Sequence, residues 1–444
     1  MTARLVSGAA LVLVCVAFQP AARGQSDLVW ATSWTGSVQG PYPVGNASAQ
    51  PDLSAVFPSP DAGARDQSFR LIVRPDVWGS EARIRLSNAF GVRPVAFDGV
   101  FVGVQMTGSA VVKDTSRPVT FGGKASITIA PGGSAWSDPI ALPFARTGAA
   151  QALAGRKLAV SFHVVGESGP MTWHAKAMTT SYVTFPGAGS KGMEEGEESF
   201  RASTTSWYFL DAVDMRVPRS TRVIVAFGDS ITDGTASTLN GDDRWPDVLS
   251  RRLHAAFGET VAVVNAGIGG NRVTSPTEYT PQKPFAGGPS AGQRLERDVL
   301  SLSNVSSVIW LEGINDLNSN AGASAEAVRA AMIDISLRMR AKNLRVLGAT
   351  LTSALGSAGG SGSPEVDQKR RALNEFIRAS ATFDGVFDFD RATVDESTGA
   401  MRSEFVPNST IGGAGDRLHP NRLGYAAMAH AIDLAMLWTA RTPR

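Results

Sequence analysis

The chain has 444 residues, of which 43% are hydrophobic and 18% charged, so it has enough apolar material for packed cores and too little charge for a disordered polyelectrolyte. Lysine and arginine total 42 against 40 aspartates and glutamates. The resulting formal net charge of +2 excludes the strong single-sign field that gathers nucleic acid or anionic lipid. The length predicts about two or three domains.

The first residues have the pattern of a secretory signal. Arg4 precedes an almost unbroken apolar run from Leu5 to Phe18, and small residues follow up to Gly24, where we expect signal peptidase to cut. The run is shorter than the roughly 20 residues that a membrane-spanning helix needs. We therefore expect residues 1–24 to be a cleaved signal peptide and the protein to be secreted or periplasmic. Cys15, the only cysteine, is interpreted as an apolar signal residue rather than a lipid-attachment site.

Residues 28–216 show short apolar alternations separated by turn-forming residues. Glu81 to Leu86 is the clearest of these segments, with Ala82, Ile84 and Leu86 on one face. Many short strands without a convincing helix predict an antiparallel β-sandwich. The expected strands are Ser68–Arg74, Glu81–Leu86, Ala125–Ile129, Lys157–Val164, Thr180–Phe185 and Trp207–Leu210.

Residues 219–440 change to an alternation of strands and helices. Arg222 to Phe227 is a nearly continuous apolar run, which is typical of a strand buried on both faces. This alternation predicts a doubly wound α/β domain with a parallel sheet. The expected strands are Arg222–Phe227, Val261–Asn265, Val305–Leu311, Leu344–Ala349 and Val386–Phe389, and the expected helices are Pro246–Phe257, Leu295–Leu302, Ala325–Ala341, Glu365–Ser380 and Tyr425–Trp438.

Four loops of this second domain carry residues suited to acyl transfer, and in such sheets ligands bind beyond the carboxyl ends of the strands. Ser230 follows the first strand and is the candidate nucleophile, with His419 as its base and Asp416 as the residue that orients His419. The candidate oxyanion donors are the backbone N–H groups of Ser230 and Gly270 and the side-chain amide of Asn315. Gly269, next to Gly270, remains an alternative donor.

These loops resemble the blocks of the SGNH (GDSL-type) hydrolase family. The matching segments are Gly228-Asp229-Ser230, the Gly269-Gly270 pair, Gly313-Ile314-Asn315-Asp316 and Asp416-Arg417-Leu418-His419. The resemblance covers roughly residues 220–440. It implies a flavodoxin-like three-layer αβα fold and ester hydrolysis through an acyl-enzyme, without metal or cofactor. The upstream β-rich region resembles the extra domain of some bacterial secreted members, through Ser87-Asn88-Ala89-Phe90-Gly91.

Each functional interpretation has a structural alternative. Ser230 and Asp229 also suit a helix cap, and Asp316 either braces its loop or contacts substrate. Gly288 to Gly292 matches a nucleophile elbow but follows a Pro/Gly-rich loop rather than a strand, so we reject it. A calcium loop at Asp388 to Asp395 is also rejected, because the sixth position lacks glycine. The other four histidines, at 163, 174, 254 and 430, are expected to be structural or surface residues.

The expected substrate is a small-molecule or polysaccharide ester, and the choice between them stays open. Export, a β-sandwich partner and the aromatic residues Trp136 and Trp173 favour carbohydrate O-acetyl groups, although such aromatics are more often core residues. A lipase-like or arylesterase-like acyl hydrolase is the alternative, and a mainly glycan-binding protein with weak hydrolase activity is a third. We expect no nucleic-acid partner and no membrane span, and the oligomeric state is left open.

Overall fold

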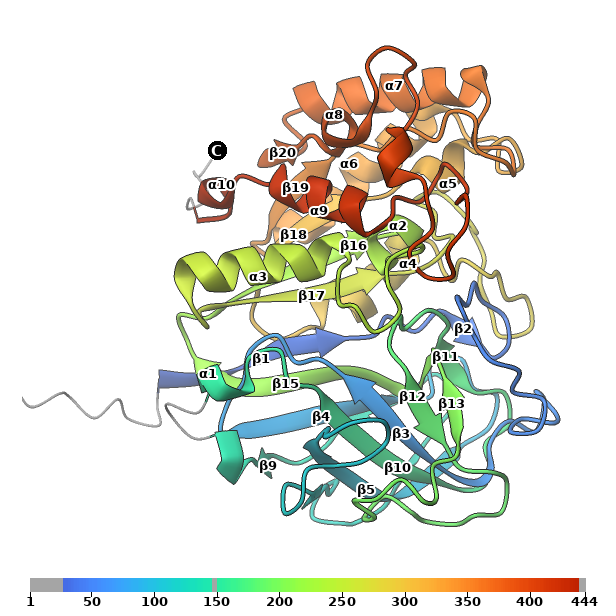
Figure 1. Ribbon diagram of the computed structural model, residues 1–444, viewed down its shortest axis with the longest axis vertical. Coiled ribbons are helices and arrows are strands. Elements are labelled where there is room, and N and C mark those ends of the chain that lie inside the picture. The colour runs from blue at the N-terminus through green and yellow to red at the C-terminus, as the bar shows by residue number, and fades with distance from the viewer. Residues whose placement is uncertain (1–26, 146–149, 439–444) are drawn as a thin grey trace, which may run out of the picture.

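The computed structural model describes residues 27–145 and 150–438. The expected signal peptide and Cys15 lie outside these ranges. Figure 1 shows a β-rich N-terminal part below a second part in which helices surround a parallel sheet, confirming the predicted combination of folds. Within the described residues, no helix is both long and apolar enough to cross a membrane.

The N-terminal part consists of antiparallel strands in three sheets. A five-stranded sheet has the order β1-β15-β4-β8 with β9 on β4, and a seven-stranded sheet has the order β13-β12-β3-β10-β5-β6 with β7 on β5. A small sheet joins β14, β11 and β2. The strands are β1 Leu28–Thr35, β2 Gly40–Pro41, β3 Arg65–Val73, β4 Glu81–Ser87, β5 Val95–Val104, β6 Arg117–Pro118, β7 Ile127–Ile129, β8 Ser134–Trp136, β9 Ile140–Ala141, β10 Leu158–Glu167, β11 Thr172–His174, β12 Ser181–Val183, β13 Ala202–Thr204, β14 Trp207–Tyr208 and β15 Leu210–Pro218, with the short helices η2 Pro143–Ala145 and α1 Ala150–Leu153.

Aromatic side chains fill the core of this part. Phe69 and Phe162, on adjacent strands, stack with ring centroids 5.3 Å apart, and Phe209 meets Phe97 edge-on at 5.2 Å. All four rings are fully buried. Such ring pairs add about 0.5–1.5 kcal/mol each beyond their buried area. The core therefore gives the β-rich part substantial packing of its own.

The C-terminal part is built on five parallel strands in the order β17-β16-β18-β19-β20. This is the flavodoxin-like order, in which the chain changes direction across the sheet beside the first strand. Right-handed crossovers then place α3 on one face and α4, α6 and α7 on the other. The elements are β16 Arg222–Gly228, α2 Ser230–Asp233, α3 Trp245–Phe257, β17 Val261–Gly267, α4 Ala291–Leu295, η3 Glu296–Leu300, β18 Val305–Leu311, α5 Ile314–Leu317, α6 Ala325–Ala341, β19 Arg345–Ala349, α7 Pro364–Ala379, β20 Gly385–Phe387, α8 Phe389–Thr393, η4 Ser403–Phe405, α9 Arg422–His430 and α10 Leu434–Trp438.

Two predicted helices differ in detail from the structure. The segment expected as Leu295–Leu302 is α4 followed by a π-helical turn, because the helix starts earlier, at the Ser290 capping box. The segment expected as Tyr425–Trp438 is split into α9 and α10, and Asp433 accepts a hydrogen bond from the Ala435 N–H at the start of α10.

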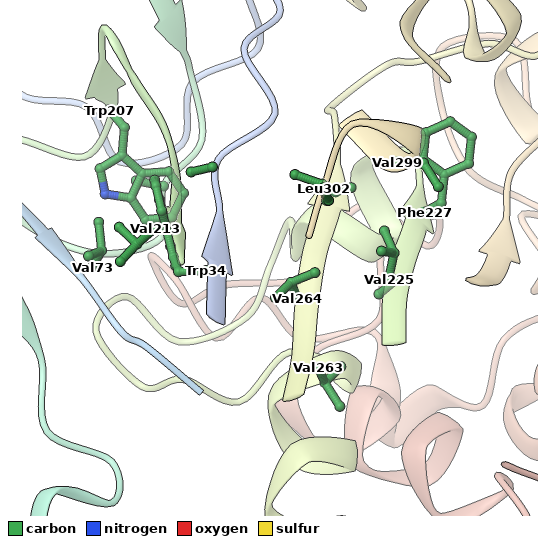
Figure 2. Packing of buried hydrophobic residues seen from close by; sticks show 14 of the residues in the cluster. Trp34, Val73, Trp207, Val213, Val225, Phe227, Val263, Val264, Val299 and Leu302 are labelled. Carbon is green, nitrogen blue, oxygen red and sulfur yellow. The ribbon is translucent and has the colours of Figure 1, made fainter. Parts of the chain in front are cut away.

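The two parts meet along β1 and β17, which run beside each other in Figure 1. β17 is an edge strand, and Asp76 of the β-rich part accepts hydrogen bonds from the Val263 N–H at 2.6 Å and from the Ser250 hydroxyl. Apolar residues from both sides of this junction belong to one buried cluster. Figure 2 shows part of that cluster, with Trp34, Val73, Trp207 and Val213 on one side and Val225, Phe227, Val263, Val264, Val299 and Leu302 on the other. The β-rich part thus covers the exposed edge of the parallel sheet.

Candidate active site

Ser230 begins a short helix at the carboxyl end of β16. Asp229 caps this helix by accepting a hydrogen bond from the Ile231 N–H, and Gly234 ends it in the left-handed conformation. Position 228 has no room for a side chain, because a Cβ there would lie 2.2 Å from the Leu311 carbonyl oxygen on β18. The structure therefore combines both interpretations of the Gly-Asp-Ser segment: it is a capped helix start, and it places Ser230 at the rim of the sheet.

The side chains of Ser230, His419 and Asp416 meet although Ser230 and His419 are far apart in the sequence. Ser230 Oγ lies 2.8 Å from His419 Nε2, and His419 Nδ1 lies 2.6 Å from Asp416 Oδ2. An Nδ1–H that donates to Asp416 leaves Nε2 as an acceptor for the Ser230 hydroxyl proton. This is the arrangement that a serine nucleophile and its base require.

Asp416 is held in its charged form by the loop that carries it. Burial alone raises its pKa, but the hydrogen bond and charge of His419 lower it more, and the N–H groups of His419 and Leu418 each donate to Oδ1 at 2.9 Å. The net result is a pKa well below the ordinary aspartate value. Asp416 is therefore an anion at any pH at which the protein is expected to work.

Three backbone or amide donors lie on the loops around Ser230. Asn315 donates through Nδ2 to the Asn271 carbonyl at 3.0 Å, which ties the third-strand loop to the second and leaves one amide proton available. Gly270 adopts φ +83°, a conformation that glycine enters without strain. In the part of the chain that the structure describes, neither the Ser230 N–H nor the Gly270 N–H donates a hydrogen bond to the protein backbone.

The neighbouring Gly269 differs from Gly270 in this respect. Its N–H donates to Asp233 Oδ2 at 2.9 Å, in a buried contact. A donor that is already used within the protein is not available to a substrate oxygen. This difference favours Gly270 over the alternative Gly269 as an oxyanion donor.

Arg294 is a buried residue that the sequence analysis did not single out. Its guanidinium donates to the carbonyl oxygens of Gly228 and Ala266, both at 2.8 Å, and to Asn271 Oδ1 at 2.6 Å. The two carbonyls lie at the ends of β16 and β17, the strands that precede Ser230 and Gly270, and Asn271 directly follows Gly270. Arg294 therefore fixes the spacing of the loops that carry those two residues.

Buried carboxyl groups lie beneath the site. Burial raises the pKa of Asp229 to about 8, and the nearby charges of Glu312 and Asp316 act in the same direction. Burial raises the pKa of Glu312 to about 7, although Arg294 and the Trp310 indole N–H favour its ionised form. Asp229 is therefore mostly protonated at neutral pH.

The β-rich part also reaches this site, which the sequence analysis did not foresee. Asn46 donates through Nδ2 to the Gly269 carbonyl at 2.8 Å, and Lys176 Nζ lies 2.5 Å from the Thr235 hydroxyl. Burial lowers the pKa of Lys176, although the charges of Asp233 and Asp416 partly oppose this. His174 contacts Asp233 at 3.1 Å. No local sequence signal marks these residues, because their partners lie across a domain boundary.

Other residues weighed in the sequence have structural roles. Asp316 accepts hydrogen bonds from the N–H groups of Val273 and Thr274 and therefore braces the second loop. Trp173 is buried, so it is a core residue and not a sugar platform, and Trp136 stacks on Arg83 at 4.3 Å.

The rejected motifs are structural: Ser290 is a helix N-cap, and Asp388 and Asp390 pair with arginines. The remaining histidines also have structural or surface positions, with His163 paired to Asp98, His254 hydrogen-bonded to the Val261 carbonyl and His430 exposed.

Comparison with known proteins finds a family match in the C-terminal part. Residues 226–427 match the sequence model of the GDSL-like lipase/acylhydrolase family. No curated protein matches the chain. Three solved structures illustrate the similarity: a lipase/acylhydrolase from Enterococcus faecalis (23% identity, 48% of this chain and 93% of that chain, TM-score 0.36), a GDSL-like lipase from Bacteroides thetaiotaomicron (18%, 49% and 88%, 0.34) and a carbohydrate acetylesterase family member from Sinorhizobium meliloti (15%, 48% and 95%, 0.36).

Proposed function

We propose that residues 226–427 form a domain of the GDSL-like lipase/acylhydrolase family, whose sequence model they match, and on this premise that the protein is an exported serine esterase. In this proposal Ser230 is the nucleophile, His419 the general base and acid, and Asp416 the residue that orients His419. The observation that carries it is the chain of two short contacts from Ser230 Oγ through the His419 ring to Asp416.

The first half of the reaction forms an acyl-enzyme. Ser230 Oγ attacks the ester carbonyl carbon while its proton passes to His419 Nε2, and the carbonyl oxygen becomes an oxyanion. The N–H groups of Ser230 and Gly270 and the Asn315 amide stabilise that oxyanion. When the tetrahedral intermediate collapses, the C–O bond to the alcohol breaks and His419 returns its proton to the leaving alkoxide.

The second half repeats these steps with water. Water loses a proton to His419 Nε2 and attacks the acyl carbonyl, and collapse releases the carboxylic acid and restores the Ser230 hydroxyl. Asp416 keeps its charge throughout and stabilises the imidazolium that forms twice in each cycle. Its lowered pKa supports this role, because a neutral Asp416 would not stabilise the imidazolium.

Short acyl groups on polar alcohols are the substrate class we propose. The side chains that contact the segments around Ser230 include Asn46, Lys176, Thr235 and Asn315, all of which are polar. Such groups can pair with the hydroxyls of a polar alcohol, whereas a long acyl chain would leave them unpaired. Carbohydrate O-acetyl esters fit this environment, and lipid-like or aryl esters are the alternative that the assay must test.

Substitution of Ser230 by alanine tests the proposal. We expect Ser230→Ala to lower turnover of nitrophenyl acetate by at least about 1000-fold while the protein stays folded, because the nucleophile is lost and only one oxygen is removed. Circular dichroism and thermal unfolding serve as the folding control. Turnover near that of the unchanged protein would refute Ser230 as nucleophile.

Three further experiments test the substrate, glycan binding and the compartment. A nitrophenyl ester series from acetate to decanoate, run beside acetate release from acetylated xylan, separates short-chain and carbohydrate esterases from lipases. Binding of the folded Ser230→Ala protein to insoluble polysaccharide tests the glycan-binding alternative. Export is tested by N-terminal sequencing of protein recovered outside the cytoplasm, which we expect to begin at Gln25.

A further inference from the structure

The peptide group between Gly269 and Gly270 is held by Asn46 of the β-rich part. Asn46 Nδ2 donates to the Gly269 carbonyl at 2.8 Å, more than two hundred residues away in the sequence. On the other side, the Gly269 N–H donates to Asp233 Oδ2 at 2.9 Å. The backbone of Gly269 is therefore fixed at both its donor and its acceptor.

Asp233 in turn contacts a residue of the β-rich part, His174. His174 Nε2 lies 3.1 Å from Asp233 Oδ1, and its Nδ1 lies 2.7 Å from the Ser37 carbonyl oxygen. Burial lowers the pKa of His174, but the charge and hydrogen bond of Asp233 and the two carbonyl acceptors raise it more. Because both ring nitrogens face acceptors, His174 is doubly protonated and forms a buried ion pair with Asp233.

Because a peptide group is planar, fixing the Gly269 carbonyl also fixes the direction of the Gly270 N–H. A trans peptide is planar, with its C=O and N–H pointing in opposite directions. Among the described residues, the only cis bonds precede Pro43 and Pro276, so the bond between Gly269 and Gly270 is trans. Holding the Gly269 carbonyl against Asn46 therefore turns the Gly270 N–H away from the β-rich part.

We infer that Asn46 is a positioning residue that aims the Gly270 N–H at the oxyanion, so that the β-rich domain completes the catalytic site rather than only binding substrate. This inference rests on the proposed function, because it assumes that Gly270 is an oxyanion donor. The close fit supports it: a Cβ at Gly270 would lie 2.6 Å from Asn46 Nδ2, and one at Gly269 would lie 3.1 Å from Lys176 Nζ. Both glycines thus leave room for side chains of the other domain.

The test compares two substitutions of Asn46 with a matched control. Asn46→Ala removes the donor, and the isosteric Asn46→Asp replaces it by a carboxylate that repels the Gly269 carbonyl. The control is Tyr279→Phe, which also removes one hydrogen bond between the two parts, from the Tyr279 hydroxyl to the Gln39 carbonyl at 2.8 Å. Asn46 is exposed and Tyr279 only partly buried, so all three variants should fold and shift the unfolding temperature by only a few degrees.

The expected result is a selective loss of kcat. Loss of an oxyanion donor costs about 100- to 1000-fold in turnover, so a misaimed donor should cost roughly 10- to 100-fold. We expect kcat on nitrophenyl acetate to fall in that range for Asn46→Ala and further for Asn46→Asp, with KM within about twofold. Tyr279→Phe should keep its kcat. A trifluoromethyl ketone, whose adduct with Ser230 carries an oxyanion, should lose affinity in parallel with kcat/KM across the series.

Each outcome decides one question. If Ser230→Ala is inactive and both Asn46 variants match Tyr279→Phe in kcat and in ketone affinity, the inference is wrong and the proposed function stands. An equal loss of kcat in Tyr279→Phe would also overturn the inference, because general weakening of the domain contact would then explain it. If Ser230→Ala remains active, the proposed function fails first.

Discussion

Asp229 shows how one buried carboxyl links the nucleophile turn to pH. Burial raises its pKa from 3.8 to about 8, so folding requires this group to bind a proton that the unfolded chain releases. The stability that Asp229 contributes is fully present below the unfolded-state pKa and is lost as the pH rises toward 8. Wild-type stability should therefore decline across this window.

We expect Asp229→Asn to remove that decline. The asparagine oxygen keeps the cap to the Ile231 N–H and carries no proton to titrate. The variant should gain stability over the unchanged protein as the pH rises from 5 to 8, by at most about 1.4 kcal/mol per pH unit. Urea unfolding at a series of pH values measures this difference. A difference that does not change with pH would show that Asp229 is charged in the folded state.

At the scale of elements, the site depends on how strand ends are held together. Arg294 bonds the carboxyl ends of β16 and β17 and pairs with Asp298 on the following turn at 3.2 Å. Its guanidinium also lies 4.1 Å above the Phe227 ring. The side chain is completely buried, and each of its three nitrogens has a hydrogen-bond partner in the protein.

We expect Arg294→Met to destabilise the protein by about 3–5 kcal/mol, since methionine fills similar space but leaves buried carbonyl and carboxylate acceptors unpaired. Chemical denaturation gives the loss in free energy of unfolding. Turnover measured well below the new midpoint should also fall, because the loops of Ser230 and Gly270 are no longer tied to each other. Stability within about 1 kcal/mol of the unchanged protein would contradict this role.

The same elements indicate what a sequence can and cannot predict. The strand expected at Val305–Leu311 and the helix expected at Ala325–Ala341 are found with those bounds, since periodicity and caps are local signals. The long helix expected at the end of the chain is broken instead, because the chain turns between His430 and Leu434 to bury Ile432. Tertiary packing decides such breaks, and a single sequence does not show it.

The candidate site divides in the same way. The order of the four loops and the spacing of Asp416 and His419 were sufficient to predict which side chains would meet. Asn46 and His174 were not predicted as parts of the site, because they lie in the β-rich region, away from the four loops, and their partners are distant in the sequence. Arg294 was missed because a buried arginine in a helix resembles a surface one in the sequence.

At the scale of the whole molecule, ion pairs join the two parts. His254 on α3 lies 3.5 Å from Asp76 of the β-rich part and 2.9 Å from the Val261 carbonyl. Burial lowers the pKa of His254, but the hydrogen bond and charge of Asp76 raise it more, to about 9. The stability from this contact is fully present below pH 6.5 and is lost as the pH rises through 9.

We expect His254→Gln to be less stable than the unchanged protein at pH 6, by up to about 3 kcal/mol, and equally stable above pH 9. Glutamine keeps a donor for the Val261 carbonyl but carries no charge opposite Asp76. Thermal unfolding from pH 6 to 10 measures the convergence of the two curves. Parallel curves over that range would mean that the histidine is neutral in the folded protein.

The hydrogen bond from the β-rich part to the Gly269 carbonyl also has a consequence for how the enzyme loses activity. Gentle heating or dilute denaturant that only loosens the contact between the two parts would release the Gly269 carbonyl from Asn46 before either part unfolds. We then expect turnover to disappear while circular dichroism still reports folded strands and helices, and to return on cooling. For this architecture, the ester hydrolysis assay would detect loosening of the contact between the two parts earlier than any spectroscopic probe of secondary structure.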